Sequence, residues 1–224
     1  MNADSMIHGD CLEEMGIMGT ESVDYVFTSP PYNRLRNDKY QHYDDTVKDW
    51  GGWMEAIIRE AIRVSQHHAI FNLQINSYNR PDVLHLLGVF AGDIKEIVVW
   101  EKSNPLPANG LNITNAVEYF MFFGGGPVRA NKSYTKNILT TAVNGEMPAM
   151  HKAVMKQEVA DYMIENFTKP GHMVLDCFMG LGTTGISCRR LGRHFIGIEK
   201  VKEYHDEAVK RIEGEFCFTP KGAK

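Results

Sequence analysis

One stretch of this chain restricts its fold more than any other, because a short apolar run leads into a glycine-rich loop and then into a helical pattern. The run 173–175 predicts a buried strand, Asp176 follows it, and the loop that ends at Gly185 contains three glycines. Glycine lets the backbone approach a ligand closely, and the first turn of the following helix offers unpaired N–H groups. The stretch therefore predicts a strand, a turn and a helix that bind a nucleotide.

Strand-like and helix-like patterns alternate along the rest of the chain. Short runs rich in β-branched and aromatic residues predict strands at 23–27, 69–73, 94–100, 117–123, 173–177 and 194–199. Apolar residues at helical spacing predict helices at about 53–65, 81–87, 154–166, 184–191 and 202–212. This alternation predicts an α/β fold with a mostly parallel, Rossmann-like sheet and helices on both faces.

Composition limits the class of protein. With 224 residues, 43% of them apolar, the chain can form one sizeable core, and we expect a single domain over 1–224. No apolar stretch reaches the roughly 20 residues that span a bilayer, and the first residues carry no secretory signal. The four cysteines include no CxxC pair, and the adjacent His67 and His68 have no third ligand nearby in sequence. We therefore expect a cytoplasmic protein with no membrane contact, no metal and no disulfide framework.

Net charge gives no general sign of nucleic-acid binding. The formal charge is -4, whereas phosphate contacts favour a basic surface, so any DNA contact must be local. Two basic clusters are candidates for it: Arg34, Arg36 and Lys39, and Arg129, Lys132 and Lys136. The second cluster belongs to the segment 128–150, which is polar with little periodicity, and we expect this segment to be an irregular or hairpin insertion.

A second motif, TSPPYN at 28–33, directly follows the first predicted strand. The hydroxyl of Ser29 and the carbonyl of Pro30 can accept hydrogen bonds from an exocyclic amino group and draw its lone pair out of the ring of a base. Proline fixes φ and stiffens the loop, and Tyr32 offers a face on which a flipped base can stack. We expect Ser29, Pro30, Pro31 and Tyr32 to form a catalytic loop.

Together the two motifs resemble those of the DNA amino-methyltransferases, which use S-adenosylmethionine to methylate the exocyclic nitrogen of adenine or cytosine. Residues 176–184, DCFMGLGTT, are similar to the family's cofactor motif DPFxGxGTT, with Cys177 in the place of the usual proline. The catalytic loop precedes the cofactor loop, an order that resembles the permuted beta group. The resemblance covers about 7–212 and implies a circularly permuted methyltransferase fold with a short recognition insertion.

The resemblance also implies which residues hold S-adenosylmethionine. The glycine loop would enclose it, and Glu199, at the end of the next predicted strand, would accept the ribose hydroxyls. The segment with Asp10 and Cys11 would contact the adenine ring, and the segment that begins at His151 would wrap the methionine end. The implied cofactor residues are Asp10, Cys11, His151, Lys152, Asp176, Phe178, Gly180, Gly182, Thr183, Thr184 and Glu199.

The same resemblance bears on the substrate. It places DNA recognition in 128–150, gives 100–105 a place beside the target base, and implies a direct methyl transfer without a metal. Ser29, the first catalytic position, favours methylation of cytosine N4 over adenine N6, which stays the alternative. Members of the beta group often form homodimers, and we expect one here.

Other classes of function are still open. The glycine pattern 180–185 also fits the GxGxxG motif of NAD-binding oxidoreductases, but such an enzyme would leave 28–33 unexplained. RNA and protein-glutamine methyltransferases carry similar Pro-Pro-Tyr loops, although they usually place the cofactor motif first. A binding protein without turnover is disfavoured, because the catalytic and cofactor motifs are both complete.

Overall fold

The computed structural model of the chain describes residues 4–33, 46–105, 113–142 and 154–214. In these residues eight strands form one sheet in the order β1-β8-β7-β2-β3-β5-β4-β6. The strands are β1 (Ser5–His8), β2 (Val23–Thr28), β3 (Ser65–Leu73), β4 (Ile94–Lys102), β5 (Val117–Phe123), β6 (Ile138–Thr141), β7 (Met173–Asp176) and β8 (His194–Glu199). Only β5 runs against its neighbours, β3 and β4, so the predicted mostly parallel sheet is confirmed.

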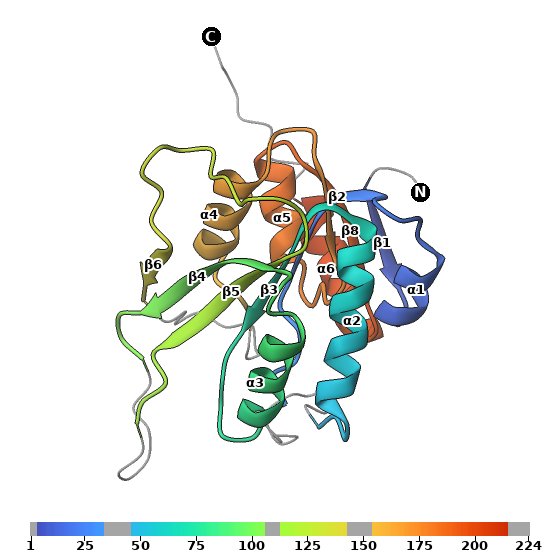
Figure 1. Ribbon diagram of the computed structural model, residues 1–224. Coiled ribbons are helices and arrows are strands. Elements are labelled where there is room, and N and C mark those ends of the chain that lie inside the picture. Colours follow the sequence, from blue (N-terminus) through green and yellow to red (C-terminus); the bar gives the residue numbers. More distant parts are fainter. Residues whose placement is uncertain (1–3, 34–45, 106–112, 143–153, 215–224) are drawn as a thin grey trace.

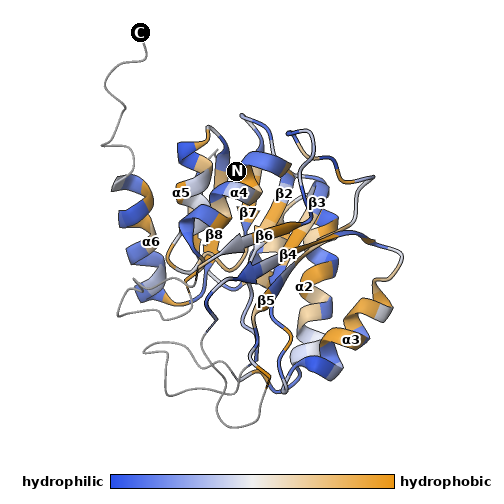
Figure 2. Cartoon of the chain, turned by 90° about the vertical axis from the view of Figure 1, so that its left-hand side faces the viewer, coloured by the Kyte–Doolittle hydropathy of each residue, from blue (hydrophilic) through white to orange (hydrophobic). Residues whose placement is uncertain are grey.

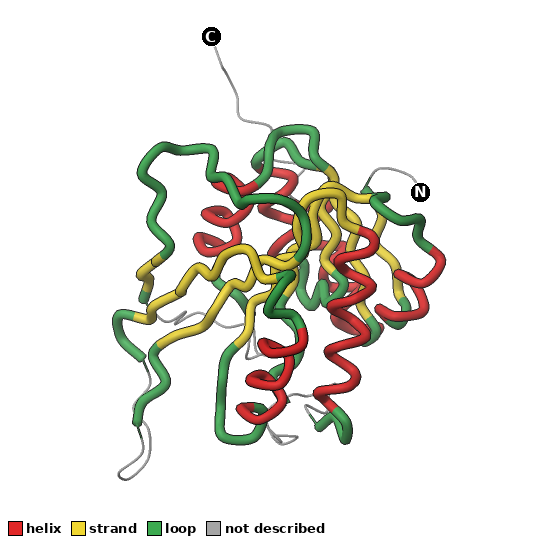
Figure 3. The backbone as a smooth tube through the Cα atoms, viewed as in Figure 1, coloured by secondary structure: helices red, strands yellow, loops and turns green. Residues whose placement is uncertain are grey.

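Helices cover both faces of this sheet (Figure 1). They are α1 (Cys11–Ile17), α2 (Trp50–Val64), α3 (Arg80–Val89), α4 (Gln157–Phe167), α5 (Thr183–Arg190) and α6 (Lys202–Gly214). The first three pack into one apolar cluster and the last three into a second cluster. Figures 2 and 3 show the apolar strands in the middle and the helices outside them. No helix in the described ranges is long and apolar enough to cross a membrane.

Helix α2 illustrates how the sequence determines an element. Asp49 caps its start, because the side-chain Oδ1 accepts a hydrogen bond from the N–H of Gly52 at 3.2 Å. One face of the helix is buried, and each large apolar side chain on it contributes roughly 1.5–3 kcal/mol. This face consists of Trp50, Met54, Ile57, Ile58, Ala61 and Val64. Near the end of α2, Arg63 donates to the carbonyl oxygens of Met15 and Met18, which joins α2 to α1.

The parallel strands bring both sequence motifs to one edge of the sheet. Strand β2 lies between β7 and β3 and runs parallel to both. The catalytic loop after β2 and the glycine loop after β7 therefore leave the sheet side by side. Ligand sites in open α/β sheets lie at this edge, beyond the carboxyl ends of the strands. Because β5 is antiparallel, its first residues, not its last, belong to the same edge.

Four elements differ from the sequence predictions. Strand β1 and helix α1 were not predicted, because four and seven residues are too few to show a period. The expectation that 128–150 is irregular or a hairpin was wrong for Ile138–Thr141, which pairs in parallel with β4 as an outer strand. Only Thr141 of β6 is buried, so the segment lacks the apolar run that would reveal a strand. Strand β3 begins at Ser65, four residues before the predicted start.

Candidate active site

Asp176 joins the two motifs at the centre of the site. Its Oδ1 atom accepts hydrogen bonds from the hydroxyl of Thr28 at 2.7 Å and from the N–H of Phe178 at 3.1 Å. Its Oδ2 atom accepts a third from the hydroxyl of Thr184 at 2.6 Å. Burial raises the pKa of Asp176, and the three hydrogen bonds only partly oppose this shift. The carboxylate therefore fixes the catalytic loop, the glycine loop and the start of α5 relative to one another.

The glycine loop adopts a backbone that only glycine tolerates well. Gly180 and Gly182 have φ angles of 53° and 80°, and Gly182 directly precedes the first turn of α5. A Cβ atom on Gly182 would lie 2.8 Å from the side chain of Ile212 in α6. Thr183 and Thr184 begin the helix and are buried. The loop thus has the glycine backbone and the helix start predicted for a nucleotide cradle, and the absence of a side chain on Gly182 lets it pack against α6.

Glu199 ends β8 beside this loop. Its Oε2 atom accepts from the N–H of Gly180 and its Oε1 atom from the N–H of Val201, both at 2.8 Å. Burial raises the pKa of Glu199, and the backbone hydrogen bonds oppose the shift in part. Each carboxylate oxygen has a second lone pair, so the side chain can accept hydrogen bonds from two ligand hydroxyls.

Asp10 lies at the same corner, because β1 pairs with β8 and the N–H of Gly9 donates to the carbonyl of Glu199 at 3.1 Å. The Oδ1 atom of Asp10 caps α1 through Leu12, and its Oδ2 atom pairs with Lys200 at 3.0 Å. Cys11 points the other way: it is 5% exposed, belongs to the core, and burial raises its thiol pKa to about 12. The structure therefore places Asp10 near Glu199 and the side chain of Cys11 in the core, and the expected cofactor contact of Cys11 stays a prediction.

A pocket separates the catalytic loop from the glycine loop. Its lining combines one residue of the catalytic loop, two residues that precede α4, and residues from Asp176 to the start of α5: Ser29, Val154, Met155, Asp176, Phe178, Met179, Gly180, Leu181, Thr183 and Thr184. Two further predicted cofactor residues, His151 and Lys152, lie outside the described residues. The chain directly after them, at Val154 and Met155, reaches the pocket.

The catalytic loop is held by its carbonyl groups. The indole N–H of Trp50 donates to the carbonyl of Pro31 at 2.8 Å. The side-chain amides of Asn76 and Asn79 both donate to the carbonyl of Tyr32 at 2.9 Å. The carbonyl of Pro30, by contrast, accepts no hydrogen bond from any part of the chain that the structure describes. The loop thus has fixed neighbours on one side and an available acceptor beside the hydroxyl of Ser29.

Two polar residues that the sequence analysis did not select support this loop. Asn72 lies near the end of β3, and Glu118 lies near the start of β5; both are buried. The side-chain amide of Asn72 and the carboxylate of Glu118 contact the hydroxyl of Tyr32 at 2.8 and 2.9 Å. A sequence signal exists, because each is a polar residue within an apolar run, 69–73 for Asn72 and 117–123 for Glu118. For Glu118, however, only the antiparallel direction of β5 reveals that it reaches this edge.

The structure separates part of the second basic cluster from the active site. Arg129, Lys132 and Lys136 are exposed. Lys132 pairs with Glu165 near the end of α4 at 2.7 Å, and the side chain of Asn131 donates to the carbonyl of Thr168. The end of α4 leads into the start of β7, so Arg129 and Lys132 lie toward the edge opposite the catalytic loop. Arg34, Arg36 and Lys39 lie outside the described residues.

One further group of ionisable side chains comes together where the strands begin. Asp24, His67 and His172 place three potential metal-ligand atoms within 4.8 Å of one another. The N–H of Lys169 donates to the Nδ1 atom of His172 at 3.1 Å, so the other ring nitrogen of a neutral His172 carries the proton and is not free to bind a cation. His68 turns inward instead and donates from Nδ1 to the carbonyl of Gly124 at 2.8 Å.

Comparison with known proteins assigns this geometry to a family. Residues 23–210 match the model of the N6/N4 methyltransferase family, described as DNA methylase. The type II methyltransferase M2.DpnII of Streptococcus pneumoniae is 27% identical over 94% of this chain and 90% of its own length. The type II methyltransferase M.HinfI of Haemophilus influenzae is 26% identical over 93% of this chain and 68% of its own length.

Solved structures share the fold. The cytosine-N4-specific PvuII DNA methyltransferase superposes with a TM-score of 0.75 at 19% identity, over all of this chain and 89% of its own. The complex of M1.HpyAVI with S-adenosylmethionine gives a TM-score of 0.69 at 23% identity, over 93% of this chain and 98% of its own. Both agree with the sheet and helix layers described above.

Proposed function

Because the chain belongs to the N6/N4 DNA methylase family and is therefore a DNA amino-methyltransferase that uses S-adenosylmethionine, we propose that it methylates cytosine N4 within a specific DNA sequence. The observation that carries this proposal is Ser29, which lines the pocket at the first position of the catalytic loop. Serine at this position is more often found with cytosine N4 in the family. The likeness to a cytosine-N4-specific enzyme agrees with it.

The residues around the pocket fit S-adenosylmethionine. We propose that the remaining lone pairs of Glu199 accept the ribose hydroxyls and that Asp10, at the same corner, contacts the adenine ring. Gly180 lines the pocket and carries no side chain that would keep a ligand from its backbone. Gly182 lets the loop pack closely against Ile212 of α6. Phe178 is held by an edge contact with Trp53, whose ring centre lies 5.5 Å away. When bound, S-adenosylmethionine supplies a methyl group on a positively charged sulfur.

The catalytic loop would prepare the amino group of the base. Its nitrogen is a poor nucleophile, because the lone pair is delocalised into the ring. The hydroxyl of Ser29 and the carbonyl of Pro30 can each accept one N–H of this group, which turns the lone pair toward the pocket. Tyr32 provides a stacking face that repays part of the stacking lost when the base leaves the duplex. This arrangement requires no covalent intermediate on the protein.

We propose two segments for DNA contact. Arg34, Arg36 and Lys39 directly follow the catalytic loop and would bind phosphates beside the flipped base. Within 128–150, we propose that the residues after β6 read the sequence, because Thr141 pairs with Lys102 and the chain leaves β6 at the active-site edge. A homodimer and a cytoplasmic location also remain our proposals; sedimentation in the presence of DNA and cofactor tests the dimer.

Product analysis tests the proposed base. The purified chain is incubated with S-adenosylmethionine and unmethylated DNA of mixed sequence, and the DNA is digested to nucleosides for mass spectrometry. We expect N4-methylcytosine. N6-methyladenine would overturn the assignment to cytosine while keeping the family. As a check on the loop, Tyr32→Ala should weaken base capture and methylation but leave the affinity for S-adenosylmethionine nearly unchanged.

A further inference from the structure

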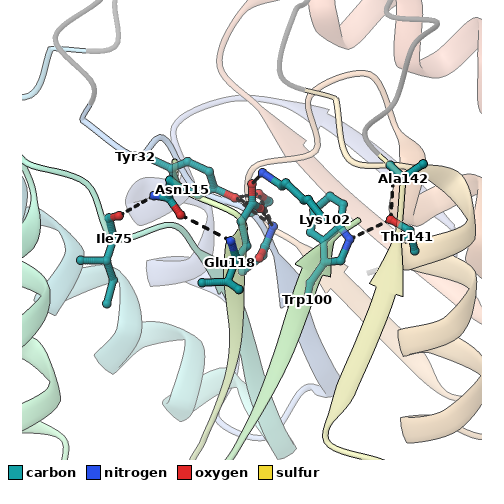
Figure 4. Close-up of polar contacts among 11 residues, drawn as sticks. Tyr32, Ile75, Trp100, Lys102, Asn115, Glu118, Thr141 and Ala142 are labelled. Carbon is teal, nitrogen blue, oxygen red and sulfur yellow. Dashed lines mark hydrogen bonds and ion pairs between the residues drawn. The ribbon is translucent and has the colours of Figure 1, made fainter. Parts of the chain in front are cut away.

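A buried polar network contacts the catalytic loop through Tyr32 (Figure 4). The hydroxyl of Tyr32 donates to Oε2 of Glu118 at 2.9 Å, and the side-chain amide of Asn72 donates to the same oxygen at 2.8 Å. The ammonium group of Lys102 pairs with the other oxygen, Oε1. The side chains of Lys102 and Glu118 are only 15% and 7% exposed, so the pair is largely shielded from water.

The network contains one group that can only accept. An ionised carboxylate has no proton to donate, whereas a tyrosine hydroxyl has one proton and can also accept. Since Glu118 takes the proton of Tyr32, the tyrosine oxygen must act as an acceptor toward the two other side chains that contact it in the described part of the chain. One of these is the amide of Asn72 at 2.8 Å, and the other is the hydroxyl of Ser29 at 3.1 Å.

The direction of the hydrogen bond between Tyr32 and Ser29 determines where the hydroxyl proton of Ser29 points. If the tyrosine oxygen accepts, the proton of Ser29 points toward Tyr32. The oxygen of Ser29 has two lone pairs. One of them faces the side-chain amide of Asn72 at 3.4 Å, which leaves the other for a group in the pocket that Ser29 lines. An amino group that donates its N–H therefore meets an acceptor. If Tyr32 donated to Ser29 instead, the serine proton would be free to point at the amino group and oppose it.

We infer that Glu118, held by Lys102, is a positioning residue that directs the hydrogen bonds from Ser29 through Tyr32, so that Ser29 acts as an acceptor for the target amino group. A buried ion pair contributes little net stability relative to apolar residues of the same volume. The contribution of Lys102 and Glu118 thus lies in the direction they impose. The inference rests on the proposed role of Ser29, and it applies to an amino group of either base.

The test replaces the carboxylate by an amide of the same shape. In Glu118→Gln the side-chain amide can donate to the oxygen of Tyr32. The hydroxyl of Tyr32 can then donate to Ser29, which reverses the hydrogen bond between these two residues. We expect kcat for DNA methylation to fall about 10- to 100-fold, the effect of one strong hydrogen bond. The Kd for S-adenosylmethionine, measured by calorimetry, and the Kd for DNA, measured by fluorescence anisotropy, should change less than about twofold. Glu96→Gln, an exposed change on the same strand as Lys102, is the matched control and should leave all three values unchanged.

A double-mutant cycle distinguishes two roles of Glu118: setting the direction of the hydrogen bonds, or only supporting the loop mechanically. Tyr32→Phe keeps the stacking ring but breaks the path between Ser29 and Glu118, so it should lower kcat to a similar extent. Adding Glu118→Gln to Tyr32→Phe should then cost less than about another twofold. Losses that multiply, or an unchanged kcat in either single variant, would overturn the inference. If Glu118→Gln fails to fold, Tyr32→Phe alone tests the inference. If Tyr32 only stacks on the base, this variant should keep the kcat of the unmodified chain. The proposed base is tested separately, by the methylated nucleoside that the unmodified chain makes, and does not depend on the kcat values of these variants.

Discussion

The hydroxyl of Thr28 donates a hydrogen bond to the carboxylate of Asp176 at 2.7 Å, although 148 positions separate them in the chain. Thr28 begins the catalytic motif and Asp176 begins the glycine motif. This buried contact therefore joins the catalytic loop, which would bind the base, to the glycine loop, which would bind the cofactor. Its removal should affect both stability and the fit of the two loops.

Thr28→Val tests this contact. The change keeps the shape of the side chain but leaves the buried carboxylate without one donor, and we expect the free energy of unfolding to fall by about 1–3 kcal/mol. Urea denaturation measures it. The control is Thr140→Val, because Thr140 also donates to a carboxylate, that of Glu101, but on the surface. Equal losses in the two variants would show that burial of Asp176 does not matter.

Glu199→Gln should weaken cofactor binding. The amide has one acceptor oxygen instead of two and no charge, so it cannot serve both Gly180 and two ribose hydroxyls. We expect the Kd for S-adenosylmethionine to rise about 10- to 100-fold in calorimetry. The exposed Glu213→Gln on α6 provides the control. An unchanged Kd in Glu199→Gln would remove Glu199 from the proposed ribose contact.

Gly125→Ala should be strongly destabilising. Gly125 has a φ of 66°, and a Cβ atom there would lie 1.9 Å from the carbonyl oxygen of His67. Backbone strain and displacement of β3 together should lower the free energy of unfolding by at least about 2 kcal/mol. The neighbouring Gly126→Ala has open space and should change it by less than about 0.5 kcal/mol. Similar thermal midpoints for the two variants would contradict this prediction.

Acidification should destabilise the fold through His68. Burial lowers the pKa of His68 below the ordinary value of 6.5. Below about pH 6.5, the unfolded chain takes up a proton that His68 in the folded chain resists, so stability falls as the pH falls through this window. Thermal unfolding at pH 7.5 and pH 5.5 measures the loss. His68→Gln, which can still donate to Gly124, should show a smaller loss than the unmodified chain, and the exposed His85→Gln should behave like the unmodified chain. An equal loss in all three would assign the effect to other groups.

Much of the fold could be predicted from the sequence because its elements are long and periodic. All six predicted strands and all five predicted helices occur in the described residues, with ends displaced by a few residues. The helix predicted from about 154 begins at Gln157, for example, because Lys156 is still extended. The elements that were missed, such as Ser5–His8 and Ile138–Thr141, are short strands at the two margins of the sheet, where little apolar surface is required.

The candidate site was predictable where chemistry follows a local motif. The two motifs line one pocket, through Ser29 and Gly180. Tyr32 contacts Ser29, and Glu199 contacts Gly180. The side chain of Cys11 lies in the core, which its motif position did not indicate, since a motif does not reveal whether a small side chain faces a ligand or the core. Glu118 was missed for the opposite reason: it has no motif, and its place depends on the direction of β5 and on the partners that other strands supply.

The pairing of β1 with β8 makes the cofactor corner depend on two segments that are synthesised far apart in time. In the described sheet β8 is the only neighbour of β1, and Asp4 accepts a hydrogen bond from the N–H of Phe195, 191 positions later in the chain. While the chain is still emerging from the ribosome, the strand before Asp10 has no partner and Glu199 is not yet present. A nascent chain therefore cannot assemble the proposed ribose and adenine contacts until β8 has been synthesised and has paired with β1.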